Sequence, residues 1–530
     1  MVVAGVVQAV AHHAAKAFAN RVQFRLEWSW VARHASCYTS QGDGARQPTL
    51  NFRSCWQESS ADGRISSVTA VRRSRWGVRP FCSLATTPLC ISETAAESLS
   101  RGLSQYNLLT RGTGMQASNL GYDSCALMAH LSAHPTRRGI ERVLEGLECM
   151  EHRTGIVTGE SDGVGVMVDV PRDLWAQWVG SVAYAPNFWV AHLFLPKSEA
   201  TRPLERVGAI LGSDGWRVLA QRQHEVCSEA LGAGARREEP LFVQIAGLMP
   251  EGEPCPERAL FHRHLQIERE TAAHVVSLSR WSVVYKVQGG ARTLHAYYPD
   301  LQHPNLTSAI TIGHSRYSTN TMPAFNRVQP FSVLAHNGEI NTIDRLRREA
   351  RMLGVALSVG GSDSQDTDRL LHHLLVEYGM SLADALEVLF PPVWSQVERM
   401  PEPKRSVYRH IRAFLGPVAQ GPAAIIARWG DVCAFATDAL GLRPLWLAPT
   451  DEGLYVCSER ASLPLEIFTD DPKPLAPGEK VIAKVVRGQT VLWSPAAEDR
   501  LDKVSPARQG DRVLPIAQPA FVNAANPESP

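Results

Sequence analysis

The sequence has few cysteines and no long apolar run. Ten cysteines occur in 530 residues, and none forms a C-x-x-C pair, which argues against a disulfide framework and against the usual zinc and iron–sulfur motifs. No uninterrupted apolar run approaches the roughly 18 to 20 residues of a membrane-spanning helix. We therefore expect a cytoplasmic protein, kept in a reducing compartment and outside the membrane.

An excess of charge of either sign is also lacking. Lys and Arg total 54 and Asp and Glu total 53, a net charge of +1, with 44% hydrophobic and 20% charged residues. This balance is typical of a folded globular protein. It disfavours a disordered chain and a nucleic-acid binder, which needs basic residues to neutralise phosphates.

Nucleotide-binding and metalloprotease motifs are absent as well. Gly163-Val164-Gly165 lacks the third glycine of a dinucleotide-binding loop, and the sequence contains neither G-x-x-x-x-G-K-[ST] nor H-E-x-x-H. The sequence therefore gives no support for a nucleotide-dependent enzyme or a zinc protease.

Residues 1–114 differ in composition from the rest of the chain. They hold 13 Lys and Arg against 6 Asp and Glu, whereas the remainder holds 41 against 47. The segment shows no sustained helical or alternating period. A transit-type leader, a disordered extension and translation upstream of a true start at Met115 are the three interpretations. We favour the third and predict a poorly ordered extension over residues 1–114.

Regular hydrophobic patterns begin near residue 120. Apolar side chains at i, i+3, i+4 and i+7 over Pro135–Leu147 predict a helix that opens with a proline. Alternating valines from Val164 to Val170 predict a half-buried strand. Further strands are expected over His274–Ser279, Val283–Lys286, Ala309–Gly313, Ala423–Ala427, Val432–Thr437 and Leu454–Ser458.

Two leucine-rich helices are predicted between these groups of strands. One follows Ser362-Asp363-Ser364, and the other opens with a capping box of Ser381 and Asp384. Strands in runs and helices in runs favour a layered α+β fold with antiparallel sheets over a βαβ repeat. After Leu492 the chain becomes polar and proline-rich, so we expect a flexible tail over residues 493–530.

Four polar segments stand among the apolar strands. Together they contain a thiol, a guanidinium, an amide next to a glycine and a carboxylate. Such groups could hold an amino acid by both charged ends while its side-chain carbonyl is attacked. The segments are Asp123–Cys125, His314–Thr321, Ala335–Thr342 and Gly361–Ser364.

These segments resemble the glutamine amidotransferase domain of the glutamate synthase large subunit, a class II (N-terminal nucleophile) amidotransferase. The resemblance covers roughly residues 116–490 and implies a four-layer αββα fold. It also implies hydrolysis of the L-glutamine side-chain amide to glutamate and ammonia, through a cysteine thioester and without a cofactor. Matching segments also include Cys125–Leu131, Leu147–Arg153, Gly159–Pro171, Asp438–Pro444, Ser458-Glu459 and Pro477–Glu479.

The resemblance implies that Cys125 is the nucleophile. In that family the nucleophile is the first residue of the mature chain, because its own α-amine serves as the base. An α-amine titrates near ~8, close to the ~8.5 of a thiol. Residues 115–124 would then be a short pro-segment and residues 125–492 the amidotransferase domain. Taken alone, Cys125 would be read as a small buried cysteine.

The resemblance also assigns the substrate contacts. Asn337 and Gly338 would form the oxyanion hole, Arg316 with Thr319 would bind the α-carboxylate, and Asp363 would bind the α-ammonium. Each has a simpler alternative. Asn337-Gly338 could be a type I′ turn, Arg316 an exposed residue at a strand end, and Asp363 part of a helix N-cap.

Further interpretations concern two histidines, one turn and the residue after Cys125. We regard His314 and His336 as structural and place Gly441–Pro444 in a turn near the core. Residue 126 is alanine where the family usually has glycine, and the added methyl group could crowd the backbone.

The chain stops at residue 530 without a flavin or iron–sulfur domain, so we expect the ammonia to pass to a separate synthase or acceptor subunit, for example a flavin-binding one. A non-catalytic regulatory or scaffold subunit and another N-terminal nucleophile amide hydrolase remain as alternatives.

Overall fold

The computed structural model describes residues 125–154, 156–157, 160–223, 225–316, 324–402, 404–414, 418–486 and 489–493. The predictions for residues 1–114 and 115–124, for Thr319 and for residues 494–530 of the tail lie outside these residues and stay predictions. Trp493, predicted as the first residue of the tail, is the last residue of a strand.

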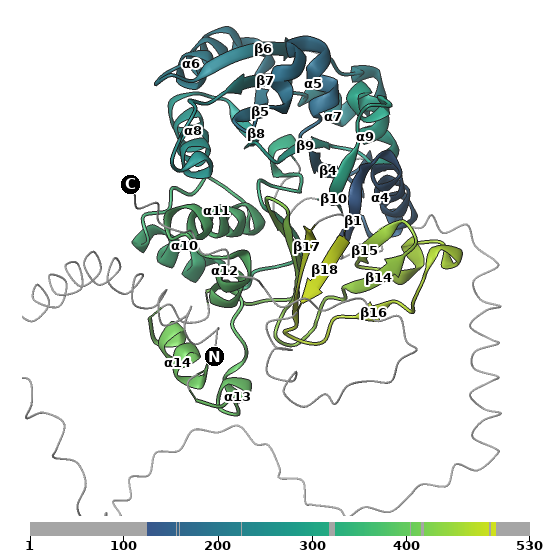
Figure 1. Ribbon diagram of the computed structural model, residues 1–530, viewed down its shortest axis with the longest axis vertical. Coiled ribbons are helices and arrows are strands. Elements are labelled where there is room, and N and C mark those ends of the chain that lie inside the picture. The colour runs from purple at the N-terminus through teal and green to yellow at the C-terminus, as the bar shows by residue number, and fades with distance from the viewer. Residues whose placement is uncertain are drawn as a thin grey trace, which may run out of the picture. The chain divides into compact units, whose positions relative to one another are not determined.

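Two antiparallel sheets pack face to face in the centre of the described part (Figure 1), with β1 packed against β11, β17 and β18. The first sheet has the order β16-β14-β15-β1-β10-β4-β9 and the second β11-β12-β13-β17-β18. The first contains β1 (Ala126–Thr136), β4 (Val164–Asp169), β9 (Ser282–Val287), β10 (Ser308–Ser315), β14 (Trp446–Thr450), β15 (Gly453–Cys457) and β16 (Lys473–Pro474). The second contains β11 (Leu334–Gly338), β12 (Ala423–Trp429), β13 (Val432–Thr437), β17 (Lys480–Val486) and β18 (Gln489–Trp493).

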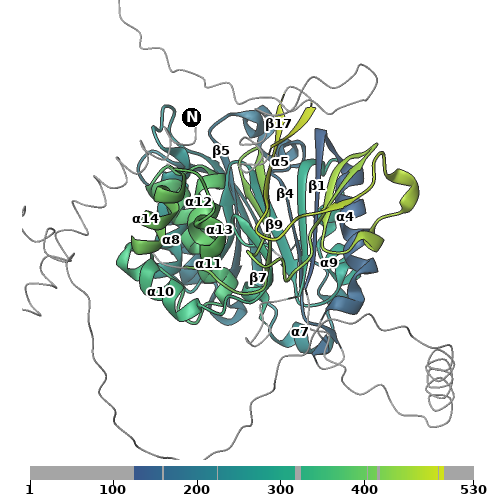
Figure 2. The ribbon, with the colours of Figure 1, turned by 90° about the horizontal axis from the view of Figure 1, so that it is seen from below.

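Helices cover the outer faces of both sheets, as Figure 2 shows. The helix α4 (Arg137–Cys149) lies on β1 and β10. It packs closely because Gly313 has no side chain: a Cβ there would stand 2.6 Å from Val143 Cγ1. On the second sheet lie α11 (Asp363–Glu377) and α12 (Leu382–Leu389), with α10 (Ile343–Met352) against α11. These are four layers, αββα, and the predicted α+β sandwich is confirmed.

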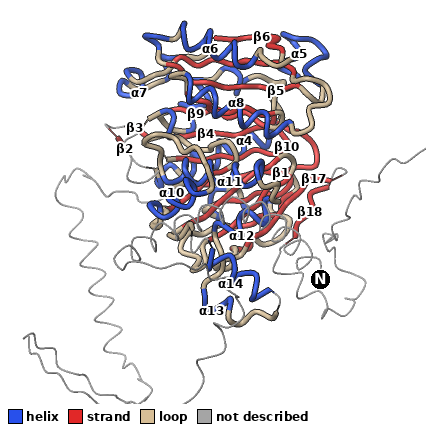
Figure 3. Tube along the Cα trace, turned by 90° about the vertical axis from the view of Figure 1, so that its left-hand side faces the viewer, coloured by secondary structure: helices blue, strands red, loops and turns tan. Residues whose placement is uncertain are grey.

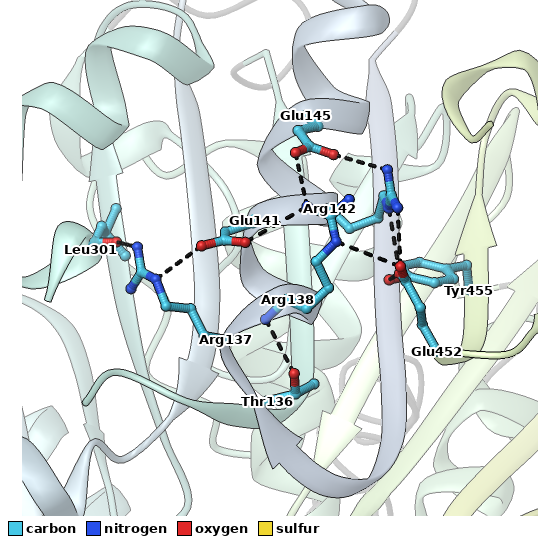
Figure 4. Close-up of polar contacts among 9 residues, drawn as sticks. All are labelled: Thr136, Arg137, Arg138, Glu141, Arg142, Glu145, Leu301, Glu452 and Tyr455. Carbon is cyan, nitrogen blue, oxygen red and sulfur yellow. Dashed lines mark hydrogen bonds and ion pairs between the residues drawn. The ribbon is translucent and has the colours of Figure 1, made fainter. Parts of the chain in front are cut away.

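Ion pairs fasten α4 to the turn between β14 and β15 (Figure 4). Arg142 and Arg138 both lie against the carboxylate of Glu452, at 3.0 Å and 3.5 Å, and the Tyr455 hydroxyl donates to the same carboxylate at 2.6 Å. At the start of the helix, the guanidinium of Arg137 donates to the backbone oxygen of Leu301 at 3.0 Å. The helix that covers β1 is thus held from both sides.

A third sheet is inserted between β4 and β9, which pair directly with each other. Its order is β6-β7-β5-β8, and its strands fill the upper part of Figure 3. The segment contains α5 (Arg172–Val179), β5 (Phe188–Leu195), α6 (Thr201–Leu211), β6 (Arg217–Gln223), α7 (Ala233–Arg237), β7 (Leu241–Leu248), α8 (Pro256–Glu270) and β8 (His274–Ser279). The remaining elements include the hairpin of β2 (Ile156–Val157) and β3 (Glu160–Ser161), with α9 (Ala291–Tyr297), α13 (Trp394–Val397) and α14 (Lys404–Phe414).

Three local predictions need correction. Pro135 lies in β1, and α4 begins at Arg137 with Thr136 as its N-cap. The alternating valines form β4, but that strand is buried on both faces except at Asp169 because it lies inside the sandwich. The Gly441–Pro444 turn lies at the surface, where Leu442 is 55% exposed.

Arg428 on β12 joins the two sheets. It is 5% exposed, donates to the backbone oxygen of Ile310 on β10 at 3.0 Å, and pairs with Asp169 at the end of β4. Replacing it by methionine is expected to lower the free energy of unfolding by about 3 kcal/mol, because the partner carboxylate and carbonyl lose their donors. Urea unfolding measures this loss. The exposed Arg348 of α10 provides the control, Arg348→Met, and equal loss in both variants would contradict the prediction.

Candidate active site

Cys125 lies immediately before β1, at the head of a central strand, and is only 3% exposed. Its backbone N–H donates to Asn337 Oδ1 at 3.2 Å. Its backbone oxygen accepts from Arg153 Nε at 3.1 Å, and Arg153 pairs in turn with Glu459 at 3.2 Å. Both main-chain groups of the cysteine are therefore fixed, so its side chain has a defined position.

Asn337 and Gly338 form the end of β11, where they pair with Ala424 and Ala423 of β12. They are strand residues, so the alternative of a type I′ turn is wrong. Gly338 has φ of 138°, and a Cβ on it would stand 1.7 Å from the backbone oxygen of Pro422. Only glycine fits this position without a shift of the backbone.

The two residues place N–H groups beside the thiol. The backbone N–H of Gly338 bonds the Cys125 thiol. Asn337 is fully buried, and its Oδ1 accepts the Cys125 N–H. Its Nδ2 has no hydrogen-bond partner among the described residues. A buried amide N–H without an acceptor costs free energy. An oxygen developing next to the thiol would supply that acceptor.

Arg316 directly follows β10 and lies near the same thiol. Its φ of 97° is in a region that side-chain-bearing residues rarely adopt, a strain of about 1–3 kcal/mol. Two contacts hold it there: its N–H donates to Gly163 O at 2.6 Å, and its Nε lies 3.6 Å from Asp162 Oδ2. Its side chain is 14% exposed, so the alternative of an exposed strand-end arginine is wrong.

Burial is the largest influence on the pKa of the Cys125 thiol, and the nearby charges act in both directions. Burial raises the pKa of the Cys125 thiol to about 11, the Arg316 guanidinium lowers it, Asp162 raises it, and the Gly338 N–H and Arg443 lower it. The net result is a thiol that stays protonated at neutral pH. It therefore needs a base before it can attack.

Asp363 is the first residue of α11, next to the N-cap Ser362, which forms a full capping box with Gln365. Its carboxylate accepts the backbone N–H of Ser364 at 2.7 Å and that of Ile340 at 2.9 Å. The N-cap interpretation is therefore correct as a local description. Ile340 follows Gly338 by two residues in the chain. Its bond to Asp363 therefore places the carboxylate beside the segment that follows β11.

His314 and His336 connect the two sheets below the site. The Nε2 of His314 on β10 lies 3.1 Å from the backbone oxygen of His336 on β11. Burial lowers the pKa of His314 to about 3 and also lowers that of His336. Both rings are therefore neutral at physiological pH, which agrees with a structural role.

Sequence reasoning assigned no role to three residues that position the site. Asp162 contacts Arg316, and Arg153 contacts Cys125, as described. Gln329 binds the backbone of His336 on both sides: it accepts the N–H at 2.7 Å and donates to the oxygen at 3.0 Å. Asp162 and Arg153 stood in segments already singled out, so their charge was the available signal. Gln329 gave none.

The alanine that follows Cys125 fits the fold. Ala126 begins β1, pairs with Ser315 and has ordinary extended backbone. Its methyl group is fully buried without requiring a glycine conformation. The predicted crowding of the backbone is therefore not seen at this residue.

A four-layer αββα sandwich with a cysteine at the head of a central strand is the arrangement of the N-terminal nucleophile hydrolases. The chain belongs to the class-II glutamine amidotransferases, whose family model matches residues 124–494. Across the described residues, no helix has the length and apolar character needed to cross a membrane.

Several curated proteins are similar over the same region. Ferredoxin-dependent glutamate synthase 2 of Synechocystis sp. is 30% identical over 394 residues, 68% of this chain and 25% of that protein. The large chain of the NADPH glutamate synthase of Bacillus subtilis is 25% identical over 423 residues, 73% of this chain and 28% of that protein. The chain thus spans about a quarter of the length of these relatives.

Among solved structures, the glutamine phosphoribosylpyrophosphate amidotransferase of B. subtilis, complexed with ADP and GMP, matches with a TM-score of 0.33 and 13% identity. That match covers 70% of this chain and 49% of the solved chain.

Proposed function

We propose that this chain hydrolyses the side-chain amide of L-glutamine to glutamate and ammonia through a thioester on Cys125. The observation that carries the proposal is the buried Cys125 thiol beside the Gly338 N–H, with Asn337 Nδ2 close by and without a hydrogen-bond partner in the described part of the chain. These two donors suit the oxyanion that forms when a thiol adds to an amide carbonyl.

The base is the part of the mechanism that depends on processing. The thiol keeps its proton at neutral pH because its pKa is about 11, and burial lowers the pKa of His314 and His336, which makes both rings poor proton acceptors. We propose that cleavage before Cys125 frees its α-amine, which titrates near ~8.

The reaction then follows in two stages. The α-amine takes the thiol proton, the sulfur adds to the amide carbon, and the proton passes to the departing nitrogen, which leaves as ammonia. Water then adds to the thioester, activated by the same amine. Glutamate is released, and the thiol is restored.

Substrate binding is assigned to Arg316, Thr319 and Asp363. Arg316 offers a planar fork for the α-carboxylate, and Asp363 offers a carboxylate for the α-ammonium. Support comes from the position of Arg316 near the thiol and of Asp363 beside the segment after Gly338.

Replacing Arg316 by lysine is expected to raise KM for glutamine about 10- to 100-fold with a smaller change in kcat. Lysine keeps the charge but loses the bidentate geometry and the Nε contact with Asp162. Steady-state kinetics with glutamine measure both constants. The exposed Arg348→Lys variant serves as control, and an unchanged KM would contradict the assignment.

For the ammonia, we propose a synthase active site as acceptor, which the names of the relatives support. A flavin-binding synthase partner and a cytoplasmic location belong to the same proposal. Affinity purification of the chain from its own cells, followed by mass spectrometry of bound proteins, tests for such a partner. Recovery of the chain without a synthase would count against it.

A glutaminase assay combined with intact mass tests the function itself. We expect a chain that begins at Cys125, releases ammonia from glutamine, and leaves asparagine and short peptides largely unchanged. A chain that retains residues before Cys125 and hydrolyses nothing would favour a scaffold subunit. Preferred cleavage of peptides would favour another amide hydrolase.

A further inference from the structure

A polar cavity lies where the inserted segment meets α11. It is lined by α8, β8, β9 and α11 and by the loop residues Phe331, Ser332 and Ser358, and it contains none of the residues assigned above. Its charged lining consists of Lys286 on β9 and of Asp368 and Arg369 on α11, with His264 and His274 beside them.

The two carboxylates at this cavity already have their donors. Glu268 takes Arg369 Nη2 at 2.5 Å, His274 Nδ1 at 3.0 Å and the Val275 N–H at 3.3 Å. Although burial raises its pKa, His264, His274 and Arg369 hold the pKa of Glu268 well below its usual range.

The second carboxylate, Asp368, accepts the Val333 N–H at 2.8 Å and also the backbone N–H groups of Leu334 and Ser332. Both carboxylates therefore have protein donors, although burial still raises the pKa of Asp368 to about 6.

The two cations have N–H groups to spare. Lys286 is 1% exposed; its Nζ donates to Asn326 O at 3.2 Å and lies 3.4 Å from His274 Nε2, which uses two of its three hydrogens. The Phe331 ring, whose centroid is 5.3 Å from Nζ, offers no hydrogen-bond acceptor to the third beyond its π face. Arg369 is 7% exposed, and its Nη1 has no hydrogen-bond partner among the described residues.

This imbalance indicates the chemistry of a ligand. Buried N–H groups without acceptors cost free energy, and the missing groups here are acceptors only. Burial also lowers the pKa of Lys286 to about 7, so an anion next to it would restore its charge.

We propose that this cavity binds a small oxyanion, either a carboxylate or inorganic phosphate, between Arg369 Nη1 and Lys286 Nζ. A bound oxyanion ties α11 to β9 of the first sheet. The anion would thereby link α11, which begins at Asp363, to β9. On β9, Lys286 pairs with Gly165 of β4, which lies two residues after Gly163.

The test measures binding to the full chain, with no reference to glutamine hydrolysis. Acetate and phosphate are titrated separately against sodium chloride at equal ionic strength, and Tm is followed by calorimetry. An anion that binds only the folded state raises Tm with the logarithm of its concentration. We expect such a rise with at least one of the two anions, and the effective anion identifies the ligand class.

Variants locate the effect. Lys286→Met removes one donor and keeps the aliphatic stem. Ser358→Leu fills the cavity from a half-buried lining position; it removes the weak contact of Ser358 Oγ with Arg369 Nη2 at 3.5 Å but keeps the ion pair of Arg369 with Glu268. Both are expected to abolish the anion-dependent rise in Tm. The neighbouring Val359, 105% exposed, provides the control Val359→Ala, which should retain it.

Two results would overturn the proposal: no greater rise with acetate or phosphate than with chloride, or a rise that persists in Ser358→Leu. Because Ser358→Leu leaves the buried charges intact, it decides the matter even if Lys286→Met fails to fold.

Discussion

Replacing Cys125 by serine is expected to lower kcat/KM for glutamine hydrolysis by at least about 10⁴-fold. A hydroxyl is a far weaker acid than a thiol, and burial opposes ionisation at this position, where it raises the pKa of the thiol to about 11. An α-amine that titrates near ~8 is a much poorer base for a hydroxyl than for a thiol, because the pKa of a hydroxyl is higher still. Ammonia release in a coupled assay measures the loss.

The matched control is Cys149→Ser, which changes an exposed cysteine at the end of α4 and should leave kcat/KM unchanged. Intact mass of both variants reports whether residues before position 125 have been removed. Activity of Cys125→Ser within tenfold of the wild type would show that another group attacks the amide.

The second large effect is expected at Asn337. Asn337→Asp keeps an oxygen that accepts the Cys125 N–H, now 3.2 Å away, but removes the Nδ2 donor. We expect kcat to fall by about 10²–10³, equivalent to roughly 3–4 kcal/mol of transition-state stabilisation, with little change in KM.

Asn337→Ala extends this experiment, because it removes the donor and the acceptor together. It should be at least as impaired as Asn337→Asp. Near-normal kcat in Asn337→Asp would mean that the unpartnered amide does not stabilise the oxyanion, and the assignment to Asn337 would be wrong.

Local sequence patterns predicted the strands in which apolar and polar residues alternate and which are flanked by turn residues. His274–Ser279 and Val432–Thr437 have the predicted bounds. The strands β5 and β7 were missed because both are buried along their whole length. Strands covered on both faces show continuous apolar runs rather than alternation, and these resemble buried helices.

The candidate site divides in the same way. Glycine next to an amide at Asn337-Gly338 and the thiol of Cys125 could be singled out from the sequence. The donation from Cys125 to Asn337 could not, because it joins residues 212 positions apart. Nor could the strained φ of Arg316, which depends on its hydrogen bond to Gly163 across β10 and β4.

The amino-acid sequence by itself determined the chemical groups of the site, the order in which they occur and the layered α+β plan, since residue type and hydrophobic period are local properties. Tertiary structure alone decided which groups meet. Among the described residues, packing of β1 against β11 left Asn337 Nδ2 without a hydrogen-bond partner, and packing of α11 against the inserted segment left Arg369 Nη1 without one. Burial gives these two unsatisfied donors their importance, because a buried polar group must find its partner within the fold or in a ligand.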